Sequence, residues 1–261
     1  MQLKSRVALV TGAAHRLGKA IATALAEQGC HLVVHYGRSE QEAVQTVDEV
    51  SALGVEAVAI SADLAQEIEI EELFSRVETH FGRLDILVNS AASFERQAFG
   101  SVSASDWDRV MAVNLRAPFL CTRQAARLIL ASRRKGEPSG LVVNLVDSSA
   151  TSVWPGYVQH GVSKAGLLHL TRIGATELAP EVRVNAIQPG AVLPPPGMEA
   201  ESRDWRRMGE LLPLGRTGDP SQVGQTAVFL AQNDFITGEV IIVDGGEHLL
   251  GAGHRRPVEE S

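Results

Sequence analysis

Residues 7–18 read VALVTGAAHRLG, and this stretch decides the expected fold. The apolar run Val7 to Val10 is typical of a short buried strand, and the periodicity that begins at Leu17 is typical of a helix. Between them, Gly12 and Gly18 mark a tight turn. A helix that starts after such a turn offers free backbone N–H groups and the positive end of its dipole to a pyrophosphate. The stretch predicts a phosphate-binding turn, with an ordinary tight turn as the alternative.

The same order of strand and helix repeats along the chain. Short apolar runs alternate with longer stretches of helical periodicity, which predicts an α/β domain: a doubly wound parallel sheet of about seven strands with helices on both faces. The expected strands are 7–10, 32–35, 57–60, 86–88, 141–146, 182–187 and 240–243. The expected helices are 17–28, 40–53, 68–81, 107–132, 157–178 and 221–231, with Gly29, Gly54 and Gly82 as stop signals.

Composition limits the class of protein. The 261 residues are 44% hydrophobic and 21% charged, which is enough apolar material for one well-buried domain. A net charge of −7 argues against nucleic acid and anionic membranes as partners, because both need a basic surface. No run is as apolar as a membrane-spanning helix, and the N-terminus lacks a signal-peptide core. Cys30 and Cys121 stand in apolar surroundings, which predicts buried free thiols and a cytoplasmic location.

Two segments depart from the regular alternation. Residues 191–213 include the prolines at 194, 195 and 196, which fit neither a helix interior nor a central strand. We expect this insertion to form a substrate lid, with Trp205 contributing to the substrate pocket. The single domain then covers residues 1–251, and residues 252–261 form a C-terminal tail without an apolar period.

A second stretch carries side chains suited to acid–base chemistry. In GYVQHGVSKAG, residues 156–166, His160 and Lys164 are four residues apart and so share one face of the expected helix. Asp147 follows the strand 141–146, and parallel sheets place their chemistry just past the carboxyl ends of strands. The three groups are therefore expected to converge. Asp147 would favour a doubly protonated His160 and Lys164 would oppose it, so the residues leave the balance open.

These residues resemble the short-chain dehydrogenase/reductase family, whose site reads Asn, Ser, Tyr and Lys. Here the four slots hold Asn114, Asp147, His160 and Lys164. Asp in place of Ser resembles the pteridine reductase branch of the family, whereas His in place of Tyr matches neither pattern. The resemblance covers residues 5 to about 248 and implies a Rossmann fold, a nicotinamide cofactor and these four residues as the catalytic group.

The resemblance also assigns a cofactor site. Arg16 replaces the middle glycine of the family's turn, as in pteridine reductases, and could meet a cofactor phosphate or the substrate. NAD-specific relatives carry an acid after the second strand, but residues 35–39 read HYGRS, so Arg38 and Ser39 favour the 2′-phosphate of NADPH. The alternative is that Arg38 is a solvated loop residue. Asp63 matches the family's adenine-binding Asp or is a helix N-cap. The expected NADPH-binding residues are Thr11, Gly12, His15, Arg16, Leu17, Gly18, Tyr36, Arg38, Ser39, Asp63, Leu64, Asn89, Ser90, Ala91, Lys164, Pro189 and Gly190.

The substrate side is expected to be aromatic. Phe94 follows the segment LVNSAAS at 87–93, and an aromatic residue in this slot stacks on the pterin in pteridine reductases; the alternative is that Phe94 covers the core. Tyr157 lies about 10 Å along the helix from Lys164, too far to replace the missing Tyr. The expected substrate residues are Arg16, Phe94, Asp147, Trp154, Tyr157 and Trp205. No Cys, His and acid cluster has ligand spacing, so no metal is expected.

The resemblance implies an NADPH-dependent reductase that acts on a small ring or carbonyl substrate, closest to the dihydropteridine or dihydrofolate class. One alternative is a carbonyl or 3-oxoacyl reductase of the same family, and the other is a non-catalytic, NADPH-binding regulatory protein. Residues 236–246 resemble the family's last strand, which packs across a two-fold axis in tetramers. We therefore expect a homotetramer with a small-molecule substrate and with neither nucleic acid nor membrane as partner.

Overall fold

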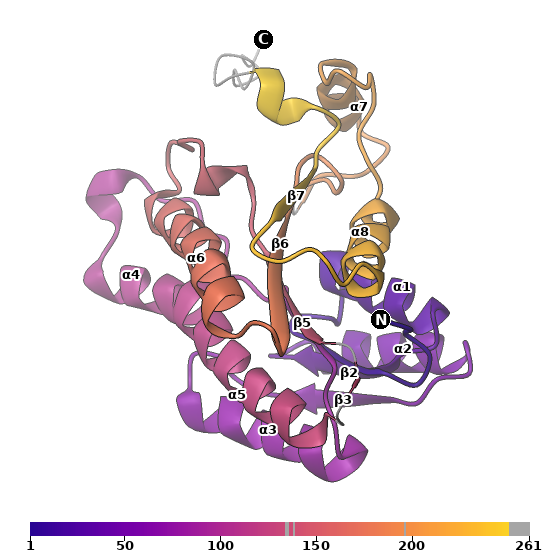
Figure 1. Cartoon of the computed structure of the whole chain (residues 1–261). Coiled ribbons are helices and arrows are strands. Elements are labelled where there is room, and N and C mark those ends of the chain that lie inside the picture. Colours follow the sequence, from indigo (N-terminus) through magenta and orange to yellow (C-terminus); the bar gives the residue numbers. More distant parts are fainter. Residues whose placement is uncertain (134–135, 138, 196, 251–261) are drawn as a thin grey trace.

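Seven parallel strands form the sheet at the centre of the chain, in the order β3-β2-β1-β4-β5-β6-β7 (Figure 1). The computed structural model describes residues 1–133, 136–137, 139–195 and 197–250. The strands are β1 Val7–Val10, β2 His31–Tyr36, β3 Ala57–Ser61, β4 Ile86–Asn89, β5 Gly140–Leu145, β6 Val182–Pro189 and β7 Val240–Val243. The central strands β1, β4 and β5 are buried along their whole length, as apolar strands covered on both faces must be. The predicted α/β fold is confirmed.

Helices cover both faces of this sheet. They are α1 Arg16–Glu27, α2 Glu40–Ser51, α3 Glu67–Phe81, α4 Ala104–Met111, α5 Ala117–Ser132, α6 Val158–Glu177, α7 Arg203–Glu210 and α8 Pro220–Gln232. One face carries α1, α2 and α8 with their own apolar core, and the opposite face carries α3, α5 and α6 (Figure 1). The site side chains described below come from the strand ends and from the helices that follow them.

One expected helix is wrong in its extent. The pattern predicts a single helix over 107–132, but the chain forms α4, a π-helical turn over Ala112–Arg116, and α5. Asn114 lies in this π-helical turn, where its side chain bonds the backbone of Ser93 instead of facing solvent. Widened turns of this kind occur mostly where a helix must present a side chain to a site. The spacing of apolar residues does not reveal the extra residue that a π-helical turn inserts, so the sequence pattern predicted one continuous helix.

The expected lid contains a helix that the sequence reading missed. Helix α7 begins after Ser202, whose hydroxyl accepts a hydrogen bond from the Trp205 N–H at 3.2 Å. Its sequence RDWRRMGE is almost entirely polar, so it has little apolar period to detect. Pro194 and Pro195 lie outside helices and strands, as predicted. Pro196 and the expected tail 252–261 lie outside the described residues.

Both cysteines are buried free thiols, as the sequence predicts, and burial raises the pKa of Cys30 and of Cys121 to about 12. The described residues include no helix with the length and apolar character to cross a bilayer. Among the same residues, no three His, Cys, Asp or Glu side chains are grouped so that they could hold a metal ion.

Candidate active site

The glycine-rich turn between β1 and α1 is tied to the end of β4. The Thr11 hydroxyl accepts hydrogen bonds from the N–H groups of Ser90 and Ala91 at 3.0 and 3.1 Å. Gly12 has a φ of +65°, and a Cβ on Gly18 would lie 2.2 Å from the Gly12 carbonyl oxygen, so only glycine fits at either position. The first turn of α1 therefore presents its unpaired N–H groups at the carboxyl edge of the sheet, where α/β proteins bind ligands.

His35 lies directly beneath this turn, a role that the sequence reading missed. Its Nδ1 accepts a hydrogen bond from the Gly12 N–H at 3.1 Å, and its Nε2 lies 3.0 Å from the Ala62 carbonyl oxygen. Because a carbonyl oxygen only accepts, Nε2 carries the proton and the ring is neutral. Burial lowers the pKa of His35 to about 4, although the hydrogen bond to Ala62 opposes that shift. The place of His35 at the end of a predicted strand, next to the glycine-rich turn, is a signal from which its contact with that turn could have been predicted.

The expected cofactor cations lie at the same edge. Arg16 has a φ of +55°, a region that side chains rarely adopt, which explains why a glycine serves in this slot in the related family. Its guanidinium donates to the Pro194 carbonyl oxygen at 3.0 Å and so reaches the lid. Arg38 is exposed and forms no ion pair with any described residue, and Ser39 is the N-cap residue of α2. The end of β2 therefore offers an unpaired guanidinium beside the glycine-rich turn.

Two of the expected cofactor side chains have other contacts. The carboxylate of Asp63 accepts from the Ala65 N–H at 2.9 Å, and because Gln66 is the N-cap of α3, the N-cap alternative for Asp63 is wrong. The Asn89 amide donates to Asn144 at 2.8 Å and to Thr122 of α5 at 3.4 Å, so its side chain lies between the sheet and that helix. The backbone of Asn89 ends β4. Of the other expected residues, Leu64 is buried, His15 is the N-cap of α1, and Leu17 lies in the first turn of that helix. Tyr36, Pro189 and Gly190 lie at or next to the ends of β2 and β6.

Asp147 and His160 form the centre of the candidate site. Asp147 follows β5, His160 lies in the first turn of α6, and the Oδ2 to Nε2 distance is 2.7 Å. The other carboxylate oxygen accepts from the Ser149 N–H at 2.8 Å and from the Ser149 hydroxyl. The Asp147 side chain is 19% exposed and that of His160 is 2% exposed. The carboxylate is therefore the member of the pair that is open to a substrate.

The negative charge of Asp147 is stabilised by Lys164. Burial disfavours a charge on Asp147, but the His160 hydrogen bond and the Lys164 ammonium outweigh it and lower the Asp147 pKa to about 2. Lys164 is buried and its Nζ donates to the Leu145 carbonyl oxygen at 2.7 Å. Burial lowers the pKa of Lys164, and the Asp147 charge opposes that shift. The three groups lie together, but only Asp147 and His160 are in direct contact.

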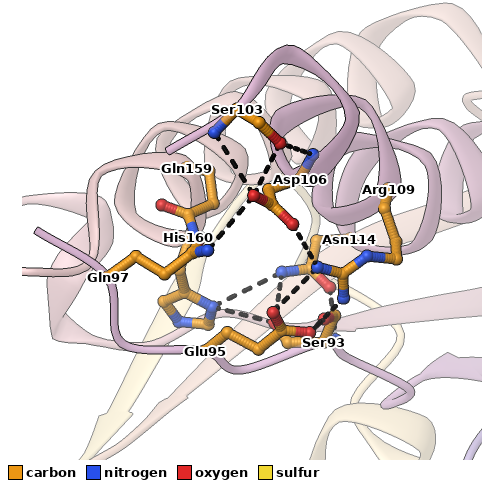
Figure 2. A network of polar contacts seen from close by, with 9 residues as sticks. All are labelled: Ser93, Glu95, Gln97, Ser103, Asp106, Arg109, Asn114, Gln159 and His160. Atoms are coloured by element: carbon orange, nitrogen blue, oxygen red, sulfur yellow. Dashed lines mark hydrogen bonds and ion pairs between the residues drawn. The ribbon is translucent and has the colours of Figure 1, made fainter. Parts of the chain in front are cut away.

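The second ring nitrogen of His160 faces the loop after β4. Nδ1 lies 3.2 Å from the Ser93 carbonyl oxygen and 3.4 Å from Nδ2 of Asn114 (Figure 2). The Asn114 amide is oriented by Ser93, whose N–H donates to Oδ1 at 2.7 Å and whose carbonyl accepts from Nδ2 at 2.9 Å. Asn114 thus lies behind His160, and its side chain makes no hydrogen bond to Lys164 among the described residues.

Aromatic rings form one wall of the site. The Phe94 ring stacks on Tyr157 with centroids 4.8 Å apart and meets the edge of His160 at 4.8 Å, while the Trp154 ring lies parallel to His160 at 6.3 Å. Phe94 is 46% exposed, so it does not serve the core, and that alternative is wrong. Trp205 differs from the expectation, because it is buried in the lid's own apolar cluster and does not line this wall.

Comparisons with known proteins agree with this geometry. Residues 12–248 match a family model described as enoyl-(acyl carrier protein) reductase. The chain is 34% identical, over 94% of its length and 100% of the relative's, to the 3-oxoacyl-[acyl-carrier-protein] reductase FabG of Staphylococcus epidermidis.

Solved structures give the same result. The FolM alternative dihydrofolate reductase 1 of Brucella canis, complexed with NADP, is 33% identical with a TM-score of 0.86, covering 95% of this chain and 96% of that one. A blue fluorescent protein from a metagenomic library, in complex with NADPH, is 29% identical with a TM-score of 0.83. The match covers 94% of this chain and 99% of that one. With its Rossmann-type sheet, glycine-rich turn and matched family model, the chain belongs to the short-chain dehydrogenase/reductase family of oxidoreductases.

Proposed function

We propose that the chain is an NADPH-dependent reductase that transfers a hydride to a small ring or carbonyl substrate, with the dihydropteridine or dihydrofolate class first. The observation that carries this proposal is the pairing of a partly exposed carboxylate with an aromatic wall. Asp147 can accept hydrogen bonds from ring N–H groups, and the half-exposed Phe94 can stack on a planar ring. The likeness to a FolM alternative dihydrofolate reductase supports this class.

The residues at the carboxyl edge fit NADPH. The absence of a Cβ at Gly18 lets α1 pack closely against the Gly12 turn, and the start of α1 favours negative charge. The unpaired Arg38 guanidinium suits a 2′-phosphate, and residues 35–39 contain no carboxylate that would repel it. When bound, NADPH supplies the hydride. Two structural neighbours, one complexed with NADP and one with NADPH, support this choice of cofactor.

His160 and Asp147 divide the handling of the proton between them. His160 is almost fully buried and its Nε2–H donates to the carboxylate, so it cannot present a proton directly to a substrate. A proton passed from Nε2 to Oδ2 would leave a neutral carboxyl group, which is partly exposed and able to donate. In this proposal Asp147 contacts the substrate, His160 returns the proton, and Lys164 keeps the carboxylate ionised between turnovers.

Two alternatives have support of their own. A carbonyl or 3-oxoacyl reductase is favoured by the 34% identity to the Staphylococcus epidermidis enzyme. A non-catalytic, NADPH-binding regulatory protein is favoured by His160, since the family's Tyr is replaced by a buried side chain. The proposal also includes a homotetramer and a cytoplasmic location, with a small molecule, and neither nucleic acid nor membrane, as partner.

A substrate screen that follows NADPH absorbance separates these functions. We expect oxidation of NADPH with reduced pterins or dihydrofolate, and turnover of a β-ketoacyl thioester instead would favour the first alternative. His160→Phe should abolish reduction and leave NADPH affinity unchanged, while His169→Asn, on an exposed face of the same helix, should leave both unchanged. If His160→Phe turns over at the normal rate, another group supplies the proton. If every substrate fails while NADPH binds, the regulatory alternative stands.

A further inference from the structure

The loop that carries Ser93 and Phe94 is held in place by an ion pair outside the catalytic group. Both guanidinium Nη atoms of Arg109, on α4, contact the Glu95 carboxylate, and the Nη2 to Oε2 distance is 2.9 Å (Figure 2). Glu95 also accepts from the Ser93 hydroxyl at 3.2 Å, so the ion pair is joined to the residue that contacts His160. The Arg109 hydrogen bond lowers the pKa of Glu95, which keeps this carboxylate ionised.

The same loop has a second attachment on its other side. The Gln97 side chain donates to Asp106 at 3.2 Å and accepts from the buried Gln159 at 2.7 Å. Asp106 in turn caps the start of α4 with Ser103 and accepts from Arg109 at 2.9 Å. Figure 2 shows these contacts as one continuous chain from α4, through the loop, to α6. The position of Ser93 is therefore set from both helices.

The Ser93 carbonyl matters because of what the His160 ring needs. Nε2 faces Asp147, which only accepts while it is ionised, so this nitrogen carries a proton in the resting state. Nδ1 faces an acceptor, the Ser93 carbonyl at 3.2 Å, and a donor, the Asn114 amide at 3.4 Å. With the carbonyl in place, a proton on Nδ1 has an acceptor, and this contact favours the imidazolium form. With the carbonyl displaced, Nδ1 would accept from Asn114 and the ring would be neutral.

We propose that Glu95 and Arg109 are positioning residues that hold the Ser93 carbonyl against Nδ1 of His160 and so keep the ring doubly protonated. They do not touch the reacting atoms, and they act through Ser93. This proposal deepens the proposed function, because a doubly protonated His160 is the form that can return a proton to Asp147. The groups that face the ring from the surrounding elements are Ser93, Phe94, Asn114, Asp147, Trp154 and Tyr157, with Lys164 acting through Asp147.

The test is ¹⁵N NMR of the histidine rings in the full-length, cofactor-free protein, with the His160 signal assigned from its loss in His160→Phe. We expect Glu95→Gln and Arg109→Met each to move His160 toward the neutral form at neutral pH, and each to lower kcat by roughly tenfold to 100-fold. NADPH affinity should not change. The double variant should cost no more than either single variant, because both remove one contact. Circular dichroism confirms that each variant is folded.

A matched control uses the ion pair between Arg123 on α5 and Glu67 on α3, which is as exposed as the Arg109 pair. Arg123→Met and Glu67→Gln should leave the His160 spectrum and kcat unchanged. A direct effect of charge would move His160 in opposite directions in Glu95→Gln and Arg109→Met, and that result overturns the positioning role. An unchanged His160 spectrum in both variants overturns it as well. Because the NMR readout needs no substrate, it decides this question even if the reductase function fails.

Discussion

Replacing His35 with Asn tests how the cofactor turn is supported and how its support depends on pH. The folded state holds His35 neutral, with its pKa lowered from 6.5 to about 4 by burial. In the unfolded chain the ring takes up a proton near its ordinary pKa, so acid favours the unfolded state. The stabilisation that comes from keeping His35 neutral is therefore fully present above the pKa of the unfolded chain. It is lost as the pH falls from about 6.5 toward about 4.

The size of the effect follows from the two pKa values. A pKa shift of this size corresponds to a contribution of about 3 kcal/mol to the free energy of unfolding. At pH 5, about 2 kcal/mol of this contribution is already lost. Asn can still accept from the Gly12 N–H with its side-chain oxygen, but it does not titrate. The unmodified protein should therefore lose about 2 kcal/mol more than His35→Asn between pH 7.5 and pH 5.

The assay is urea unfolding followed by circular dichroism at a series of pH values. His169→Asn, which removes an exposed histidine, is the matched control and should keep the pH dependence of the unmodified protein. NADPH affinity should not fall through His35 over this range, because the ring in the folded protein stays neutral and keeps accepting from the turn until the pH approaches about 4. Parallel stability curves for the unmodified protein and His35→Asn over this pH range would refute the assignment of a neutral, acceptor His35.

Three further predictions follow from the same structure. Calorimetry should show tighter binding of NADPH than of NADH, and Arg38→Asp should reverse that order; equal affinities of the unmodified protein for both would contradict the role of Arg38. Asn144→Leu leaves the buried amide of Asn89 and the hydroxyl of Thr171 without their shared partner. The free energy of unfolding measured in urea should therefore fall by about 1–3 kcal/mol. An unchanged midpoint of urea unfolding would show that the hydrogen bonds of Asn144 to Asn89 and Thr171 do not stabilise the protein. Light scattering at micromolar concentration should give the mass of a tetramer, and a monomeric mass would count against the proposed assembly.

Much of the fold could be predicted from local pattern. Apolar strands such as Val7–Val10 and Val240–Val243 are bounded by turn residues, and their bounds match the expected ones. The predictions failed where a local pattern was absent or broken, at the polar helix α7 and at the π-helical turn that divides the expected helix 107–132. In both places a side chain to backbone hydrogen bond, and not apolar periodicity, decides the backbone.

The sequence predicted those parts of the candidate site in which the position of a residue within a helix or strand decides where its side chain points. His160 and Lys164 lie on one helical face, and Asp147 follows a strand, so their meeting could be expected from spacing alone. Spacing could not show that Asn89 packs between the sheet and α5, or that Trp205 packs against Ala191 and Leu212, because burial depends on the tertiary contacts of each segment.

The sequence by itself determined the alternating α/β order, the glycine-rich turn after β1 and the meeting of Asp147, His160 and Lys164, because each follows from the place of a residue within a strand or helix. Only the tertiary structure decided which member of the Asp147 and His160 pair is exposed, and that Ser93 and Asn114 meet the second ring nitrogen. The loop after β4 and helix α6 are more than sixty residues apart, as the separation of 67 between Ser93 and His160 shows. Their contact exists because parallel strands bring distant segments to one edge of the sheet, and the protonation of a buried ring depends on which atoms that edge places around it.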